Sequence, residues 1–117
     1  MAQVRYGLFA STSSNSTQGS MNMRATINGT VIAESDETVV VEGNHYFPAD
    51  SIKNEHFVAA ASNLTTGCPW KGTASYYDIV VDGETLETVA WTYAEPKPEA
   101  ENIRDHVAFY PAVTVGA

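Results

Sequence analysis

The sequence predicts a small, mainly β domain, built as a barrel-like or folded antiparallel sheet with two short helices. Two observations support this fold class. The pairs Asn28-Gly29 and Asp82-Gly83 stand between apolar runs, and such pairs accept the two positive φ angles of a tight hairpin turn. Short runs of β-branched and aromatic residues recur along the chain between turn residues, as is typical of small barrels and folded sheets.

The length and composition predict one domain preceded by a leader. The chain has 117 residues, of which 44% are hydrophobic, enough for a single packed core. Residues 10–20 are almost all small and polar, and such a stretch buries too little apolar area to offset the cost of ordering it. We therefore expect a flexible leader over residues 1–22 and a single β-rich domain over 23–117.

The first half of the domain is expected to hold a hairpin, two strands and a helix. Strands over about 25–27 and 30–32 flank the Asn-Gly turn. The β-branched run Thr38–Glu42 and the aromatic His45–Phe47 are predicted strands. A helix over about 50–57 follows, because the Asp and Ser at its start can accept hydrogen bonds from its free N–H groups.

The second half is expected to centre on one long hairpin. Its strands, 72–81 and 84–93, are joined at Asp82-Gly83 and follow a loop over 62–69. A short helix over 98–104 has proline and acidic residues first and arginine last, as helix ends prefer. Residues 106–110 and 112–115 are the predicted closing strands.

A two-residue turn at Asp82-Gly83 would pair residues whose numbers sum to 165. One face of the hairpin then carries large aromatic residues, and Asp78 lies opposite Glu87. Like charges directly across a ladder are destabilising. Three explanations stay open: a bulge separates the two carboxylates, both are solvated, or they share a proton or a cation.

The charge balance disfavours some partners. Six Lys and Arg stand against fourteen Asp and Glu, for a net charge of -8. The six basic residues are scattered, so we expect neither nucleic acid nor a membrane surface as partner. No apolar run is long enough to span a bilayer. Cys68 is the only cysteine, which excludes an internal disulfide and fits a reducing, cytoplasmic compartment.

The segment Cys68-Pro69-Trp70-Lys71-Gly72 is the least ordinary stretch. Proline fixes φ and restricts the residue before it, so the segment should be stiff and hold its side chains in defined directions. Cys68 could be a nucleophile with Lys71 favouring its thiolate, Lys71 could hold an anion or form an imine, and His45 could be the base. The ordinary alternative is an inert cysteine, a core tryptophan and a solvated lysine.

The leading hypothesis is a small-molecule pocket next to this segment. Lys71 would meet an anionic or carbonyl group, and aromatic rings would stack on a planar or apolar body. The residues expected to line the pocket are Tyr46, Trp70, Lys71, Tyr76, Trp91 and Tyr93. The histidines and the cysteine lack zinc-ligand spacing, so neither a metal nor a cofactor is expected.

Several separated motifs resemble the bacterial "domain of unknown function 427" family. They are Gly29–Asp36, Val41–Pro48, Cys68–Tyr77 (CPWKGTASYY), Ala90–Tyr93 with Pro96 and Pro98, and Val107–Phe109. The resemblance covers about residues 24–115 and implies a compact β-rich fold without an assigned activity. The family is also placed under a nucleotidyltransferase heading. That chemistry needs a Gly-Ser loop and paired carboxylates for magnesium, whereas Gly19-Ser20 lies in the leader and only Asp78 and Asp82 are loosely placed.

Two alternatives to ligand binding remain. One is a small enzyme, a hydrolase or transferase, that uses Cys68 or Lys71 with His45 or a carboxyl group as base. The other is an interaction module that forms a homo-oligomer by burying its aromatic residues against a second subunit.

Overall fold

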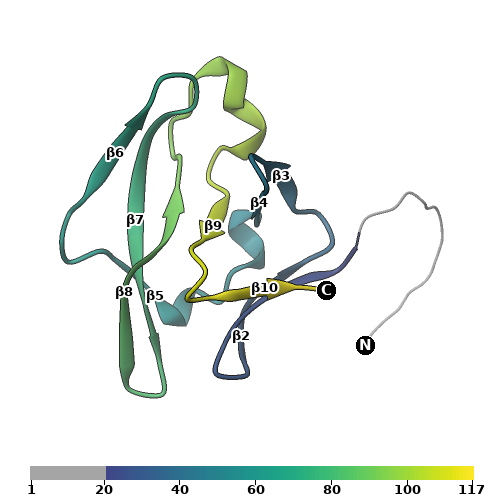
Figure 1. The fold of residues 1–117 in the computed structure, drawn as a ribbon, viewed down its shortest axis with the longest axis vertical. Coiled ribbons are helices and arrows are strands. Elements are labelled where there is room, and N and C mark those ends of the chain that lie inside the picture. The colour runs from purple at the N-terminus through teal and green to yellow at the C-terminus, as the bar shows by residue number, and fades with distance from the viewer. Residues whose placement is uncertain (1–20) are drawn as a thin grey trace.

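A computed structural model describes residues 21–117, which form ten β-strands and three short 3₁₀ segments (Figure 1). All strand pairs within its sheets are antiparallel. The mainly β, folded-sheet prediction is therefore confirmed. The predicted leader lies outside the described residues except for its last two. None of the helical segments in the described part of the chain is long and apolar enough to cross a membrane.

The first sheet, here called the short sheet, contains both ends of the described chain. Strands β1 (Met23–Ile27) and β2 (Thr30–Ser35) pair through the predicted turn, in which Asn28 and Gly29 have φ of 50° and 81°. Strand β10 (Thr114–Gly116) pairs with the other edge of β1. The predicted first hairpin is confirmed, and the C-terminal strand joins it.

The two strands predicted next pair with each other. Strands β3 (Val39–Val41) and β4 (Asn44–Tyr46) form a hairpin whose turn residues, Glu42 and Gly43, have φ of 54° and 81°. Beyond β4, the backbone N–H and C=O of Phe47 each bond Val107 at 2.8 Å. The β3–β4 hairpin is thereby attached to the largest sheet.

The largest sheet, here called the main sheet, is built around the predicted long hairpin of β7 (Gly72–Val81) and β8 (Glu84–Thr92). Strand β9 (Val107–Phe109) pairs with β8. On the other side of β7 lie two short strands in succession, β5 (Phe57–Ala59) and β6 (Thr65–Cys68). The prediction of a loop over 62–69 was therefore wrong, because half of that stretch is a strand.

The predicted helix over 50–57 was also wrong. Two single 3₁₀ turns stand there, η2 (Ala49–Ser51) and η3 (Asn54–His56), separated by extended backbone. Ile52 forms a bridge with Ala33 of β2, and the N–H of Lys53 donates to the carbonyl of Ile32 at 2.7 Å. Pairing with the short sheet thus interrupts the helix. The second predicted helix is present as a 3₁₀ segment, η4 (Pro98–Ile103).

A bulge settles the question of the facing carboxylates. The pairs Val81↔Glu84 to Ile79↔Leu86 follow the predicted register, but Tyr77 then pairs with Ala90. Asp78 is buried and accepts hydrogen bonds from the N–H groups of Ala61 at 3.1 Å and Thr88 at 2.8 Å. Of the three explanations left open, the bulge is the one that the structure shows. It corrects the cross-strand pairs beyond it, so that Tyr76 lies opposite Trp91 and not opposite Val89.

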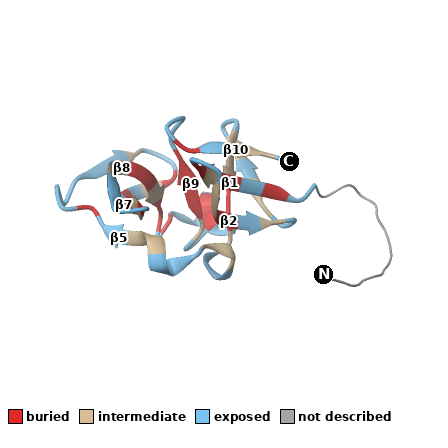
Figure 2. Cartoon of the chain, turned by 90° about the horizontal axis from the view of Figure 1, so that it is seen from below, coloured by how far each residue is buried: buried red, intermediate tan, exposed pale blue. Residues whose placement is uncertain are grey.

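The main core lies between the short sheet and one face of the main sheet, where Figure 2 shows the buried residues gathered. Ile27 and Ile32 of the short sheet share this core with Ile79 and Phe109 of the main sheet and with Phe47. The described part of the chain measures 43 × 38 × 19 Å, and its strands form separate sheets that do not close into a barrel. The residues on the opposite face of the main sheet do not belong to this core and pack in a second cluster.

Candidate functional site

The face of the main sheet that points away from the main core is rich in aromatic rings. Tyr76 and Trp91 lie opposite each other on β7 and β8, and Tyr110 follows β9. Tyr46 of β4 and Tyr93 pack in the same cluster. We call the surface made by these five residues the aromatic face.

Trp91 lies between the buried and the exposed members of the aromatic face, Tyr46 and Tyr110. Its indole N–H donates to the hydroxyl of Tyr46 at 3.1 Å, and the two rings meet edge to face with centroids 6.2 Å apart. On its other side, the ring of Tyr110 lies 4.6 Å away at an angle of 51°. Tyr46 is completely buried whereas Tyr110 is 42% exposed. Solvent therefore reaches this cluster at Tyr110 and the adjacent part of Trp91.

Three hydroxyl groups gather beside these rings. The hydroxyls of Thr66 and Tyr76 are 2.8 Å apart, and the hydroxyl of Tyr110 donates to that of Tyr76 at 3.5 Å. The hydrogen bond to Tyr76 and partial burial raise the pKa of Tyr110 to about 12. Tyr110 is therefore uncharged at neutral pH, when its O–H group can donate and accept hydrogen bonds.

Lys71 lies at the tip of the hairpin between β6 and β7, and only 7% of it is exposed. Its ammonium group pairs with the carboxylate of Glu42 in the β3–β4 turn. The same nitrogen lies 5.5 Å from the ring centroid of Trp70 and 5.6 Å from that of Tyr93, within range of cation–π attraction. This ion pair joins the tips of two hairpins that are far apart in the sequence.

Both partners of this ion pair stay charged at neutral pH. Burial lowers the pKa of Lys71, but the hydrogen bond to Glu42 and the nearby acidic groups outweigh it, so the pKa lies above its ordinary value. The hydrogen bond from Lys71 lowers the pKa of Glu42 below its ordinary value. An ammonium group held in this way is a poor nucleophile, because imine formation needs the neutral amine.

The hairpin tip that carries Trp70 and Lys71 is fastened to the chain after β8. Gly72 has φ of 112°, and a Cβ there would lie 3.4 Å from backbone atoms of Glu95 and Lys97. The N–H of Lys97 donates to the carbonyl of Lys71 at 3.0 Å, and its ammonium donates to the carbonyl of Pro69 at 2.6 Å. Glycine is favoured here by its positive φ, whereas the neighbouring backbone would leave room for a Cβ at ordinary contact distance.

Four of the six residues predicted to line a pocket lie in one cluster: Tyr46, Tyr76, Trp91 and Tyr93. The other two, Trp70 and Lys71, adjoin it, because the Lys71 ammonium lies near the rings of both Trp70 and Tyr93. Tyr76 is buried beside the hydroxyl groups described above. Three described hollows of the surface are lined by other residues. The most exposed ring of the aromatic face is that of Tyr110, next to Trp91.

The residues predicted to be catalytic lie in different surroundings. Cys68 is half-buried and packs against the aromatic cluster. His45 neighbours Tyr46 in β4 and so projects to the opposite side of that hairpin, where its Nδ1 lies 2.9 Å from the hydroxyl of Thr38. Tyr46, but not His45, belongs to the cluster against which Cys68 packs. The catalytic roles of Cys68, Lys71 and His45 stay predictions.

Sequence reasoning missed three residues of this region: Glu42, Thr66 and Tyr110. Gly43 occupies the position that glycine takes in an Asn-Gly or Asp-Gly turn, but glutamate is not among the residues that favour the positive φ of Glu42. Tyr110 lies two residues after Ala108, and side chains two apart on a strand point to the same face. Because Ala108 pairs with Trp91, this spacing would have placed Tyr110 on the aromatic face. Thr66 was missed because the sequence predicted a loop over 62–69, where strand β6 lies.

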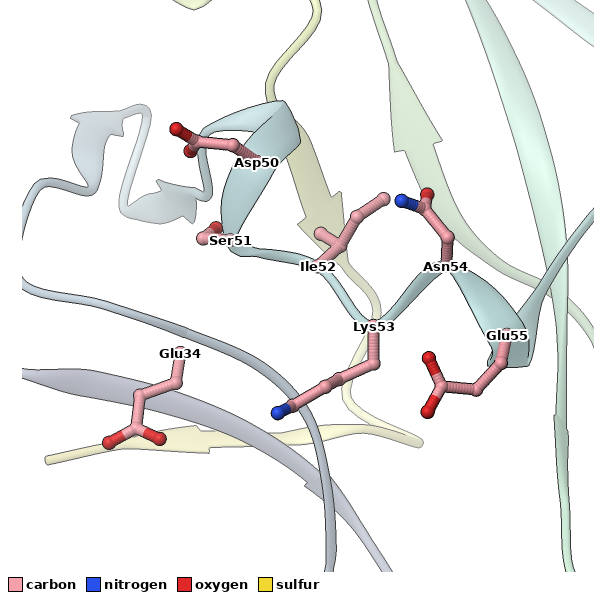
Figure 3. Close-up of a pocket in the computed structure, with 7 residues that line it drawn as sticks. All are labelled: Glu34, Asp50, Ser51, Ile52, Lys53, Asn54 and Glu55. Atoms are coloured by element: carbon pink, nitrogen blue, oxygen red, sulfur yellow. The ribbon is translucent and has the colours of Figure 1, made fainter.

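A hollow of about 560 Å³ lies on a different part of the surface from the aromatic face (Figure 3). It is lined by Glu34 of β2 and by residues 50–55, with the side chain of Lys53 directed between Glu34 and Glu55. Glu34 is already bonded to Arg24 at 3.1 Å and to Asn22 at 2.6 Å. Across residues 21–117, no three His, Cys, Asp or Glu residues are grouped so as to hold a metal ion.

The fold and this surface define a small antiparallel β domain with a partly covered aromatic face. The chain belongs to the family described as "Domain of unknown function (DUF427)", whose model matches residues 15–116. This confirms the resemblance read from the sequence motifs. A search of curated proteins found no match to the chain.

Proposed function

We propose that the aromatic face binds a small molecule, which would rest on the rings of Trp91 and Tyr110. The observation that supports this most is the 42% exposure of Tyr110 at 4.6 Å from Trp91. Beneath them, Tyr46 and Tyr76 hold the hydrogen bonds that orient the cluster. Rigid aromatic groups with a few fixed hydroxyls are typical of small-molecule sites.

The charges nearby favour an uncharged ligand with a ring or apolar body. The Lys71 ammonium lies 5.6 Å from the ring of Tyr93 in this cluster, and it is paired with the carboxylate of Glu42. The net charge of -8 also opposes anions. The hydroxyls of Thr66, Tyr76 and Tyr110 can donate or accept hydrogen bonds with polar substituents of the ligand. In this proposal Lys71 orients the two hairpin tips and does not touch the ligand.

The enzyme alternative has less support. The raised pKa of Lys71 keeps its ammonium group protonated, which speaks against an imine-forming role. Cys68 remains as a candidate nucleophile, and its modification by a thiol-reactive probe across a pH series would test it. A reaction rate that rises only as an ordinary thiol ionises, near pH 8.5, would argue against a nucleophile.

The ligand proposal can be tested by screening uncharged ring compounds for a rise in melting temperature of the full chain. For any hit, Tyr110→Ala should weaken binding about tenfold, because it removes a ring contact and the apolar area that the ring covers. Quenching of tryptophan fluorescence would report binding, since Trp91 lies in the site.

Val40→Ala is the matched control, because Val40 is another exposed apolar side chain, on the β3–β4 hairpin. It should leave the affinity unchanged. If no compound raises the melting temperature, or if Tyr110→Ala binds a hit as well as the unaltered chain does, the proposal fails.

A further inference from the structure

The outer edge of the main sheet is formed by β6 and is open. Strands β5 and β6 share one side of β7, and no other described strand lies beyond them. Thr65, Thr66 and Gly67 of β6 are all exposed. A strand at such an edge presents backbone N–H and C=O groups that another strand can pair with.

This edge lacks the charged residues that usually block strand pairing. Residues 57–70 contain no Asp, Glu, Lys or Arg, although the chain has twenty such residues, 6 basic and 14 acidic. Val58, Leu64 and Trp70 lie within this segment, and they are three of the six large apolar residues exposed in the described chain. Charges, especially lysine, are the common protection of an edge against pairing, so this edge is unprotected.

We infer that β6 pairs with β6 of a second copy of this chain, as an antiparallel strand pair about a two-fold axis. Two copies that each carry a net charge of -8 repel one another over most of their surfaces. An uncharged edge lets them meet without bringing carboxylates together. An antiparallel pair of identical strands is also self-complementary, so the assembly closes as a dimer.

The geometry of this pairing joins the aromatic faces of the two copies. A two-fold axis that relates antiparallel strands of one sheet stands perpendicular to that sheet, so equivalent faces lie on the same side. Thr66 of β6 points to the aromatic face, because its hydroxyl bonds that of Tyr76. The hydroxyl groups of both copies would therefore approach each other across the axis. This inference does not depend on a ligand.

Sedimentation equilibrium of the full chain over a range of concentrations tests the inference. We expect a reversible monomer–dimer equilibrium. Thr65→Asp places a like charge at the edge of each copy and should raise the dissociation constant at least about tenfold. Thr85→Asp is the matched control, because Thr85 is an exposed threonine of β8 in the same sheet and away from this edge. It should leave the constant unchanged.

Amide hydrogen exchange of the unaltered chain gives a second test that needs no variant to fold. Exchange at residues 64–68 should slow as the concentration rises, because pairing protects the N–H groups that face outward. A monomer at every concentration would overturn the inference. So would a dimer that Thr65→Asp leaves intact, or one whose protection appears elsewhere in the chain.

Discussion

The two faces of the main sheet are made from alternate residues of the same strands, yet they are stabilised in different ways. On the core face, Ile79 and Ala90 are completely buried against the short sheet among apolar side chains. On the aromatic face, a hydrogen bond joins Trp91 to Tyr46, and the ion pair of Lys71 with Glu42 lies beside the rings. One face is closed by a sheet, and the other is only partly covered by a hairpin.

The difference between the two faces shows which of them can provide binding specificity in so small a domain. Apolar packing is non-directional and resists a change of volume, so the core face determines stability. Hydrogen-bonded rings are directional and need their partners in place, so the aromatic face keeps defined polar atoms near solvent. Three substitutions would test this division, starting with the one expected to cost most.

Ile79→Ala should give the largest loss, because it leaves a cavity in the main core. We expect the free energy of unfolding to fall by about 2–5 kcal/mol, measured by urea denaturation. Val58→Ala is the control: Val58 is 51% exposed on the neighbouring strand β5, and its loss should be within about 0.5 kcal/mol. Equal losses would mean that the core face is not the more stabilising one.

Asp78→Ala should cost about 1–3 kcal/mol, because it removes a buried carboxylate that accepts hydrogen bonds from the N–H groups of Ala61 and Thr88. The same urea measurement applies. Glu87→Ala is the matched control, since the bulge places this second carboxylate in solvent. If Glu87→Ala cost as much as Asp78→Ala, the assignment of Asp78 as the structural member of the pair would be wrong.

The smallest expected effect concerns pH and the ion pair of Glu42 with Lys71. The pKa of Glu42 is lowered on folding by its hydrogen bond to Lys71. Its contribution to stability is therefore present above the ordinary value of 4.5 and is lost as the pH falls through the lowered pKa. The raised pKa of Lys71 has the opposite consequence, because its contribution is present below 10.5 and is lost as the pH rises through the raised value.

Glu42→Gln should remove the acid-side part of this dependence, which unfolding curves between about pH 3 and pH 7 would reveal. Glu37→Gln makes the same change of charge at an exposed position just before β3 and serves as the control. An unaltered pH dependence in Glu42→Gln would show that the ion pair does not stabilise the folded chain.

Much of the fold could be predicted because its signals are local. The turns at Asn28-Gly29 and Asp82-Gly83 depend on positive φ at neighbouring residues, and this preference is visible in any sequence. The helix over 50–57 was predicted wrongly: neither turn there has a side-chain cap, and Ile52 pairs with β2. Pairing between distant strands outweighs local helix propensity, and the pattern of a single sequence does not reveal which strands pair.

The candidate site was predicted in part. Trp70 and Lys71 were singled out because they follow a rigid proline, and Trp91 because it lies on the hairpin face that carries aromatic residues. The partners that define their chemistry were not, because Glu42 and Tyr110 are 29 and 19 positions from Lys71 and Trp91. Which rings stay exposed follows from how the β3–β4 hairpin covers the sheet.

The sequence by itself determined the fold class, the two tight hairpins, the family and the acidic surface, because each depends on composition or on neighbouring residues. Only the tertiary structure decided the bulge at Asp78, the Lys71–Glu42 pair and the open edge of β6. Each of those depends on which distant strands lie side by side, and that is decided by packing of the whole chain.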